Sequence, residues 1–487
     1  MVDTTVAPQS LAKNTSLFTI ALVGQKVVSF LYFTFLARLL GPAQMGKYVL
    51  ALSFAGVFSV LLDAGFSQLL TREVAREREH SVVYLNGVLG FKLALSLLVI
   101  LLTVLMSHLV GYPPLTRQLI YIASLVMVLD SFTLTAYSVM RGWHVLTWES
   151  LGTVASQIVV GLVGVVISLF SQDTRWLMVA LVLSSILNLT YAFNRLTKGF
   201  AVKLRPIFKI DLWRQLWWLV WPFTLAVVLT RLYGSADSVL LSILSGERAV
   251  GIYSVPYKIT FAWQFIPSAF AASLFPGFSS YFALARDKLA DTFSRGVIYL
   301  TAIGWPLSLG IALLARPIII KIYPQYQEAV IPLQILILSL TFLFITFPIG
   351  SLLPACDRQK RHTLNIALST IFNIALNIYL IPRYGATGAA VASLLATIFL
   401  LILGWQVVEQ ILDYDRSFLW GRLARVALCG LALAVVVLLL RNSLPLSMVI
   451  ISGAVTYAGL LVACGGITRQ ELNGLWWLIK AWRFKKV

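Results

Sequence analysis

Long apolar runs recur along almost the whole chain and constrain its fold more than any other sequence feature. A helix of about 20 apolar residues crosses the ~30 Å hydrocarbon core of a bilayer. About fourteen segments between residues 15 and 464 have that length and character. Backbone amides find no water in lipid, so each run must satisfy its hydrogen bonds internally as a helix. We therefore expect an all-α polytopic membrane protein with about fourteen transmembrane helices.

The distribution of Lys and Arg sets the expected orientation. With the N-terminus inside, the inner segments hold 25 of these residues and the outer loops hold 9. Lys and Arg are retained in short cytoplasmic loops, so both termini are predicted to be cytoplasmic in a multi-pass protein of the cell (inner) membrane. The net charge of +19 follows largely from this bias, and it does not indicate a nucleic-acid partner.

The loop with most cations divides the chain. Residues 196–214 hold five Lys and Arg residues, and four tryptophans that suit a bilayer interface lie at the end of this segment or just after it, at positions 213, 217, 218 and 221. A basic, Trp-rich tail is expected to lie on the membrane lipids of the inner leaflet. The predicted parts are a cytoplasmic N-terminus (1–14), an N-lobe of helices 1–6 (15–195), a basic cytoplasmic linker (196–214), a C-lobe of helices 7–12 (215–409), helices 13–14 (410–464) and a basic interfacial tail (465–487).

One segment of the chain occurs twice. Residues 17–48 overlie residues 222–253 at an offset of 205 positions, and both copies end in Gly-x4-Gly-x-Tyr. The repeat predicts two pseudo-symmetric six-helix lobes, followed by two C-terminal helices. The pairs that define it are Thr19 with Thr224, Lys26 with Arg231, Gly41 with Gly246, Gly46 with Gly251 and Tyr48 with Tyr253.

Four cations fall inside predicted spans: Lys26, Lys92, Arg231 and Lys258. A charge at mid-bilayer costs about 2.5–3.5 kcal/mol on insertion scales, so it normally faces a bundle interior or a wet cavity. The stem of Lys26, about 6 Å long, cannot reach an interface roughly 15 Å away. Lys92 lies nearer the inner end of its helix, where its side chain can also reach the interface. We predict that these cations bind an anionic substrate.

A polar stripe on the helix around Arg231 supports a cavity. Thr224, Arg231 and three serines follow one another at spacings of 7, 4, 3 and 4 residues, which places them on one helix face. The alternative is that each cation only neutralises a buried acid. Asp63, Asp130 and Asp237 are available, and Arg231 is near Asp237 in sequence. For the acids we favour helix–helix pairing, with proton or ion coupling as the alternative.

Other site chemistry finds little support. The segment Gly41 to Tyr48 resembles a phosphate-binding loop, but Tyr48 replaces the required hydroxyl residue and no strand precedes it. The histidines and cysteines lack ligand spacing, so we expect no metal and no cofactor.

Two related halves with cations at equivalent depths are typical of alternating-access carriers, and Arg suits phosphate. The sequence predicts a transporter for an anion, not an enzyme.

Four segments resemble a known family: 37–48 (ARLLGPAQMGKY), 61–76 (LLDAGFSQLLTREVAR), 236–258 (ADSVLLSILSGERAVGIYSVPYK) and 382–393 (PRYGATGAAVAS). Their order and spacing are similar to those of prokaryotic polysaccharide (O-antigen type) lipid-linked oligosaccharide flippases, within the multidrug/oligosaccharidyl-lipid/polysaccharide exporter superfamily. The resemblance implies two lobes around a central cavity and movement of an undecaprenyl-pyrophosphate-linked oligosaccharide from the inner to the outer leaflet. It implies that Lys26, Arg231 and Lys258 meet the pyrophosphate or acidic sugars. Polysaccharide-assembly proteins would be partners.

Two alternatives to this interpretation remain. A multidrug or small-molecule exporter of the same superfamily would use acids in its cavity, which Asp63, Asp130 and Asp237 could supply. A polytopic glycosyltransferase, polymerase or ligase would need acidic or histidine residues on a sizeable outer loop. The first predicted outer loop has no acid and the others are short, so the enzyme is the weaker alternative.

Overall fold

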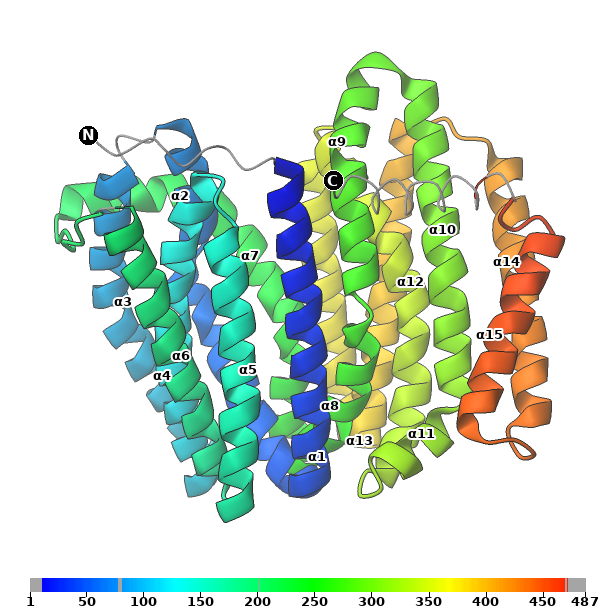
Figure 1. Ribbon diagram of the computed structural model, residues 1–487, viewed down its shortest axis with the longest axis horizontal. Helices are drawn as coiled ribbons and strands as arrows, with labels where there is room; N and C mark the ends of the chain where they lie inside the picture. The colour runs from blue at the N-terminus through cyan, green and yellow to red at the C-terminus, as the bar shows by residue number, and fades with distance from the viewer. Residues whose placement is uncertain (1–10, 78–80, 201, 469–470, 472–487) are drawn as a thin grey trace. The chain divides into compact units, whose positions relative to one another are not determined.

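A computed structural model describes residues 11–77, 81–200, 202–468 and 471 of the chain (Figure 1). Most of the predicted N-terminal segment (1–14) and most of the predicted tail (465–487) lie outside these residues. The helices are α1 (Leu11–Asp63), α2 (Phe66–Arg76), α3 (Ser81–Leu109), α4 (Pro114–Gly142), α5 (Thr147–Phe170), α6 (Thr174–Asn194), α7 (Ile210–Ser245), α8 (Glu247–Ala262), α9 (Phe265–Leu284), α10 (Arg286–Leu313), α11 (Ala315–Ile322), α12 (Val330–Ala355), α13 (Gln359–Ile411), α14 (Arg416–Leu440) and α15 (Leu446–Ala463), with a π-helical turn at Arg195–Gly199 and a 3-10 turn at Gln327–Ala329.

The expected all-α polytopic fold is confirmed. Over the described residues the structure contains helices and no strands, and eleven of the helical segments are long and apolar enough to cross a membrane. The number fourteen stays a prediction. It differs from eleven partly because α1 and α13 are each continuous through a bend, at Gly41 and at Gly385. The apolar runs predict two spans in each of these stretches, 15–38 and 45–70 in the first and 362–382 and 385–409 in the second.

The bends use glycine because the backbone there is left-handed. Gly41 has φ 66° and ψ 174°, and Gly246, its partner in the repeat, has φ 83° and ψ 173° at the end of α7. A side chain at these angles would be strained, whereas glycine adopts them freely. The two copies of the repeated sequence thus turn the chain with nearly the same backbone conformation.

The first compact unit comprises residues 1–254 together with residues 377–386 of α13. Figure 1 shows α3, α4, α5 and α6 running alongside one another within it. The helix α1 packs against α4, α5 and α7, and α4 packs against α6, α3 and α2. The unit therefore holds α7, which the repeat assigns to the second half of the chain, in contact with helices of the first half.

The second compact unit comprises residues 255–376 and 387–487. Its centre is α10, which packs against α12, α14 and α9, while α14 packs against α15. Phe278 and Phe293 lie in one of its apolar clusters with their side chains fully buried. Apolar side chains of α14 and α15 remain exposed, for example Leu428 and Leu439 of α14 and Ile451 and Val455 of α15, as expected for helices that face lipid.

Candidate functional site

A break between α1 and α2 places an acid in the interior of the first unit. The helix α1 ends at Asp63, and α2 starts at Phe66 after Ala64 and Gly65, which have φ values of 45° and 91°. The break interrupts the helical hydrogen-bond ladder inside an apolar region, where a free carbonyl is costly. Thr224 of α7 supplies a partner, since its hydroxyl donates to the Ala64 carbonyl at 2.6 Å.

Lys92 of α3 pairs with the acid at this break. Its ammonium lies 2.9 Å from Asp63 Oδ1 and also donates to the hydroxyls of Ser131 (3.0 Å) and Thr135 (2.9 Å) on α4. The Ser67 hydroxyl donates to the same carboxylate oxygen at 2.6 Å. Lys92 is 0% exposed, so it is fully buried in this conformation. The pair therefore binds α1, α2, α3 and α4 together through one buried charge.

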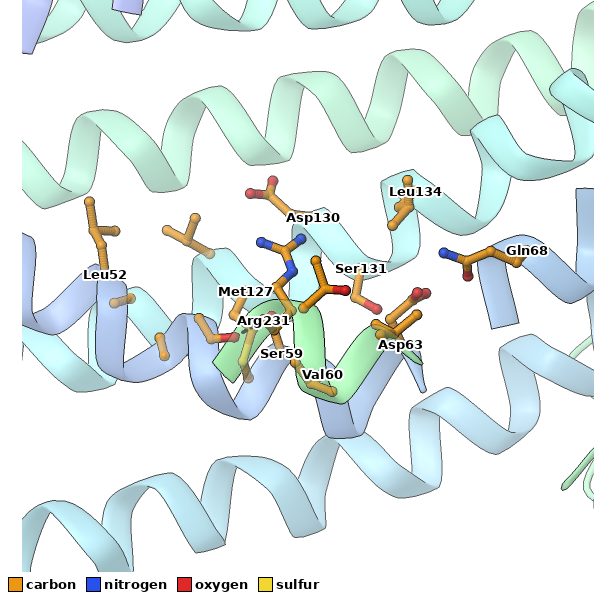
Figure 2. A pocket seen from close by; sticks show the side chains of 16 residues that line it. Leu52, Ser59, Val60, Asp63, Gln68, Met127, Asp130, Ser131, Leu134 and Arg231 are labelled. Atoms are coloured by element: carbon orange, nitrogen blue, oxygen red, sulfur yellow. Dashed lines mark hydrogen bonds between the residues drawn. The ribbon is translucent and has the colours of Figure 1, made fainter. Parts of the chain in front are cut away.

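A cavity of about 710 Å³ opens beside this pair, within the first unit (Figure 2). The second part of α1, α4 and α7 provide its walls, and apolar side chains such as Leu52, Val60 and Met127 make up most of them. This volume is in the range of small-molecule sites, in which apolar walls with a few polar groups are typical. The charged side chains that line the cavity are Asp63, Asp130 and Arg231.

Arg231 and Asp130 project into the cavity from different helices. Arg231 is exposed on α7, and no hydrogen bond or ion pair to its guanidinium is found among the residues that the structure describes. Asp130 of α4 accepts a hydrogen bond from the Ser185 hydroxyl at 2.7 Å through Oδ1. Asp63 is largely shielded and its charge is offset by Lys92. The cavity thus presents one guanidinium and one exposed carboxylate to a ligand.

Lys26 and Lys258 are not among the residues that line this cavity. Lys26 lies exposed on the first part of α1 and is not among the lining residues. In the part of the chain that the structure describes, its ammonium has no hydrogen bond or ion pair. Lys258 is half-buried on α8 and belongs to the second unit. Substrate contacts by these two lysines stay predictions.

Asp237, the suspected partner of Arg231, lies in a separate buried network. Its carboxylate accepts hydrogen bonds from the Tyr253 hydroxyl (2.9 Å) and from the Asn377 amide (2.7 Å). All three residues belong to the first unit. The acid therefore ties α7 and α8 to the part of α13 that packs with them, and the guanidinium of Arg231 is left to the cavity.

Sequence reasoning missed the side chains that hold Lys92. Ser131 and Thr135 are spaced four residues apart on α4, and Ser131 directly follows Asp130. That spacing was the available signal, because residues i and i+4 share a helix face. What identified them as partners of Lys92 was the contact between α3 and α4, which no local pattern contains.

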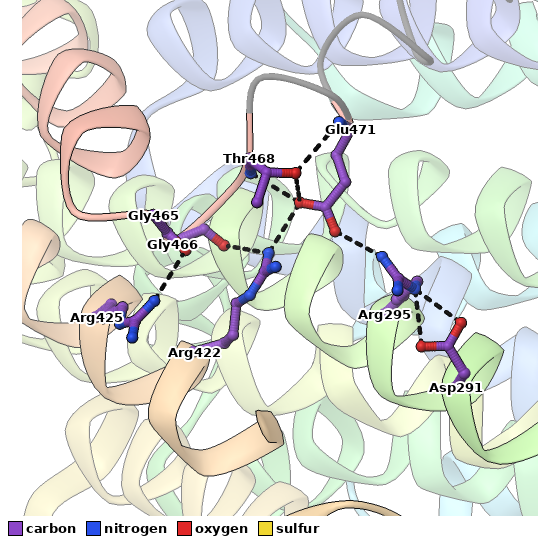
Figure 3. A network of polar contacts seen from close by, with 8 residues as sticks. All are labelled: Asp291, Arg295, Arg422, Arg425, Gly465, Gly466, Thr468 and Glu471. Carbon is purple, nitrogen blue, oxygen red and sulfur yellow. Dashed lines mark hydrogen bonds and ion pairs between the residues drawn. The ribbon is translucent and has the colours of Figure 1, made fainter. Parts of the chain in front are cut away.

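A second cluster of charges lies in the second unit, after α15 (Figure 3). Glu471 accepts hydrogen bonds from Arg295 of α10 and Arg422 of α14, both at 2.8 Å. The backbone N–H of Thr468 also donates to it, at 2.7 Å. Burial raises the pKa of Glu471, but the hydrogen bonds from Arg422 and Thr468 outweigh burial and hold the pKa at about 2. This cluster fastens the end of the described chain to α10 and α14.

A bundle of membrane-length helices around a cavity with a few charged side chains is the architecture of a membrane carrier. The chain belongs to the polysaccharide biosynthesis protein family, whose sequence model matches residues 11–282, more than half of the chain. The model of the MatE family matches residues 222–379. The predicted membership of the multidrug/oligosaccharidyl-lipid/polysaccharide exporter superfamily is confirmed.

Known proteins of similar length agree with this assignment. A protein of Haloferax volcanii, named as a low-salt glycan biosynthesis flippase, is 23% identical over 79% of this chain and 81% of its own length. A protein of Shigella flexneri, named as an O-antigen transporter, is 21% identical over 78% of this chain and 94% of its own. The solved structure of the lipid II flippase MurJ in an inward closed conformation matches with a TM-score of 0.76 at 17% identity, covering 91% of this chain and 97% of that one. The last match establishes a shared fold.

The buried ion pair predicts a strong dependence of stability on both partners. Replacing Lys92→Met leaves the Asp63 carboxylate without its cation, and it should reduce the free energy of unfolding by about 3–5 kcal/mol. The free energy of unfolding should fall less in the double variant Lys92→Met/Asp63→Asn than in the single variant, because the double variant leaves no unpaired charge. The stability of both variants is measured by heating the protein in detergent and detecting the remaining folded fraction by size-exclusion chromatography. Arg175→Gln is the control, since its pair with Asp173 is exposed and its loss should leave stability nearly unchanged. Equal losses from the single and double variants would contradict this prediction.

The Glu471 cluster predicts a pH-dependent contribution to stability. Glu471→Gln should reduce the free energy of unfolding by about 2 kcal/mol at neutral pH, because hydrogen bonds from two guanidinium groups lose their charge assistance. The folded pKa is below the usual value for Glu. The contribution is therefore complete above about pH 5, and it disappears as the pH falls toward the folded pKa. Thermal unfolding of both proteins over this pH range measures it, with Asp291→Asn, on the exposed side of Arg295, as the control. Parallel pH profiles of the wild type and Glu471→Gln would contradict it.

Proposed function

We propose that this protein moves a lipid-linked oligosaccharide, of the undecaprenyl-pyrophosphate type, from the inner to the outer leaflet of the cell membrane for the synthesis of a surface polysaccharide. It does so by alternating access, with both termini in the cytoplasm. Family membership, and relatives named as a flippase and an O-antigen transporter, support the choice of substrate class. Proteins that assemble the polysaccharide would act before and after it.

The observation that carries this proposal is the exposed guanidinium of Arg231 in an otherwise mostly apolar cavity. A cation in a membrane interior is costly unless it is paired or faces water and a ligand. The described residues give Arg231 no hydrogen-bonded partner, while the Lys92 ammonium makes four hydrogen bonds, to Asp63, Ser131 and Thr135. The planar donors of Arg fit the oxygens of a pyrophosphate in a bidentate manner. Arg231 is therefore the residue that would bind the diphosphate.

The substrate would be divided between the cavity and the lipid. The diphosphate and the first sugars enter the cavity, and the lipid tail stays in the bilayer, since a long hydrocarbon already surrounded by lipid gains no free energy by leaving it. Lys26, at the repeat position equivalent to Arg231, and Lys258 would contact the head group as it passes. Movement of the two halves of the chain would then expose the head group to the outer face.

The proposal predicts that Lys26 and Arg231 together are essential for translocation. In vesicles containing the purified protein and a lipid-linked oligosaccharide, the double variant Lys26→Gln/Arg231→Gln should reduce head-group translocation by at least about a hundredfold, because it removes both cations. Arg231→Lys should retain part of the activity, since it keeps the charge but not the fork of donors. Appearance of the sugar at the outer leaflet, detected by a lectin that cannot cross the membrane, is the measurement.

The control for this experiment is Arg175→Gln, which removes an exposed cation already paired with Asp173. It should translocate at the wild-type rate. Inorganic pyrophosphate should compete with the substrate in the wild type. Wild-type translocation by the double variant, in protein that is inserted normally, would refute the role of the cations.

Asp130 is the proposed group for ion coupling. Its side chain is exposed in the cavity and is held by one hydrogen bond, from Ser185, so it can gain or lose a proton or a cation as the cavity changes access. Asp130→Asn should make translocation independent of an imposed pH or sodium gradient, while translocation without a gradient persists. Rates in vesicles with and without each gradient measure this. A full gradient response in Asp130→Asn would exclude the residue from coupling.

Export of small organic cations is the second candidate function. The match of the MatE model and the exposed carboxylate of Asp130 favour it. The other two acids do not, because Asp63 is paired with Lys92 and Asp237 is hydrogen-bonded elsewhere. Competition distinguishes the candidates, since an organic cation rather than pyrophosphate should inhibit an exporter of this kind.

A further inference from the structure

The two copies of the repeat pack backbone against backbone at Gly46 and Gly251. We infer that Gly46 and Gly251 form the outer gate of the transport path, a contact that must separate before the head group can leave. This inference rests on the proposed function for its meaning, because only a carrier needs such a gate. The contact itself is a property of the structure and lies wholly within the first unit.

The contact is symmetric. A Cβ added to Gly46 would overlap the carbonyl oxygen of Glu247 and lie 3.0 Å from the backbone N of Gly251. A Cβ added to Gly251 would overlap the carbonyl oxygen of Pro42 and lie 3.0 Å from the backbone N of Gly46. Pro42 and Glu247 are themselves 205 positions apart, as the two glycines are. Each copy of the turn therefore packs its backbone against the same place on the other copy.

Two hydrogen bonds join the halves of the chain near this contact. The Tyr112 hydroxyl, in the loop between α3 and α4, lies 2.7 Å from the hydroxyl of Ser242 at the end of α7. Thr116, at the start of α4, donates to the carboxylate of Glu247 at the start of α8. The charge bias of the sequence assigns all these segments to the outer face. The outer ends of the two halves are thus closed by backbone packing and a few polar contacts.

A contact of this composition can open and close at low cost. Close packing of glycine backbones contributes dispersion energy only while the surfaces fit, and it falls steeply with a gap of 0.5–1 Å. Tyr112, Ser242, Thr116 and Glu247 are near the outer interface, where water can replace the lost hydrogen bonds. A salt bridge buried among membrane helices, such as Lys92–Asp63, has no such replacement. The weak, symmetric contact is therefore the part of this assembly suited to repeated separation.

Two buried side chains beside the glycines provide reporters. Met45 and Val250 occupy equivalent positions of the repeat and are both 0% exposed. If the gate opens, both should become accessible to water from outside. Leu177, near the start of α6 and also 0% exposed, lies at the same predicted end of the bundle but outside the contact. It should remain buried throughout.

The experiment measures labelling of single cysteines by a maleimide that cannot cross the membrane, added outside intact cells. Cys356, Cys429 and Cys464 are first replaced by Ser. In the native-glycine background, Met45→Cys and Val250→Cys should label slowly but completely, and Leu177→Cys should not label. Adding Gly251→Ala to the Met45→Cys protein, or Gly46→Ala to the Val250→Cys protein, should raise the labelling rate at least about tenfold, because alanine disfavours the closed contact.

Matched glycine substitutions separate gate opening from general loosening. Gly24→Ala on α1 meets no atom within 4 Å, and Gly161→Ala on α5 meets only Val28 at 3.8 Å. Neither should change the labelling of Met45→Cys or Val250→Cys. A similar increase from either control would attribute the effect to destabilisation and overturn the inference.

The outcome does not depend on the transported molecule, since labelling needs no substrate. If Met45→Cys is as unreactive as Leu177→Cys, with native glycines and with Gly251→Ala, the contact is a permanent part of the fold and the inference is wrong. If Gly251→Ala prevents membrane insertion, the labelling of Met45→Cys against Leu177→Cys in the protein with native glycines still decides whether the contact opens. A gate that opens in a protein that fails to translocate lipid-linked sugars would leave the inference standing and refute the proposed substrate.

Discussion

The first unit depends on a buried charge that must be paired. Lys92 is fully enclosed among membrane helices, and an unpaired ammonium there would be one of the most costly groups in the chain. Asp63 meets it because α1 ends at that residue and the chain turns through Ala64 and Gly65. The freed carbonyl of Ala64 then accepts from Thr224, which docks α7. The ion pair thus links the break between α1 and α2 to the position of α7, the helix that carries Arg231.

The two halves of the chain use their repeated sequence for different purposes. At the glycines the copies behave alike, with matching backbone angles at Gly41 and Gly246 and reciprocal packing of Gly46 and Gly251. At the cations they differ, since Arg231 lines the cavity and Lys26 is exposed elsewhere on α1. A glycine in close backbone contact cannot be replaced without moving the backbone, whereas the identity of a side chain in a cavity can differ with the ligand. This difference fits a scaffold that is symmetric and a binding site that is not.

Much of the fold could be predicted from the sequence because lipid leaves the backbone few choices. Long apolar runs must be helices, and the first glycine of each Gly-x4-Gly-x-Tyr motif lies where α1 bends or directly after α7 ends. The number of spans was harder, because Gly385 bends a continuous helix that local patterns read as two. The candidate site could be predicted only in part. Arg231, Asp63 and Asp130 share a cavity, but Lys92 is enclosed by Ser131 and Thr135, whose role no local pattern revealed.

The sequence by itself determined that the chain is an all-helical membrane protein with a repeated turn and a few charges at membrane depth. Those features are local, because hydrophobic length and glycine conformation act within one segment. Only the tertiary structure decided which partner each charged side chain contacts. Asp237 was near Arg231 in sequence, yet its carboxylate binds Tyr253 and Asn377, which the packing of α7, α8 and α13 brings to it. Pairing in a bilayer is decided by which helices touch, and contacts between distant segments are absent from any one stretch of sequence.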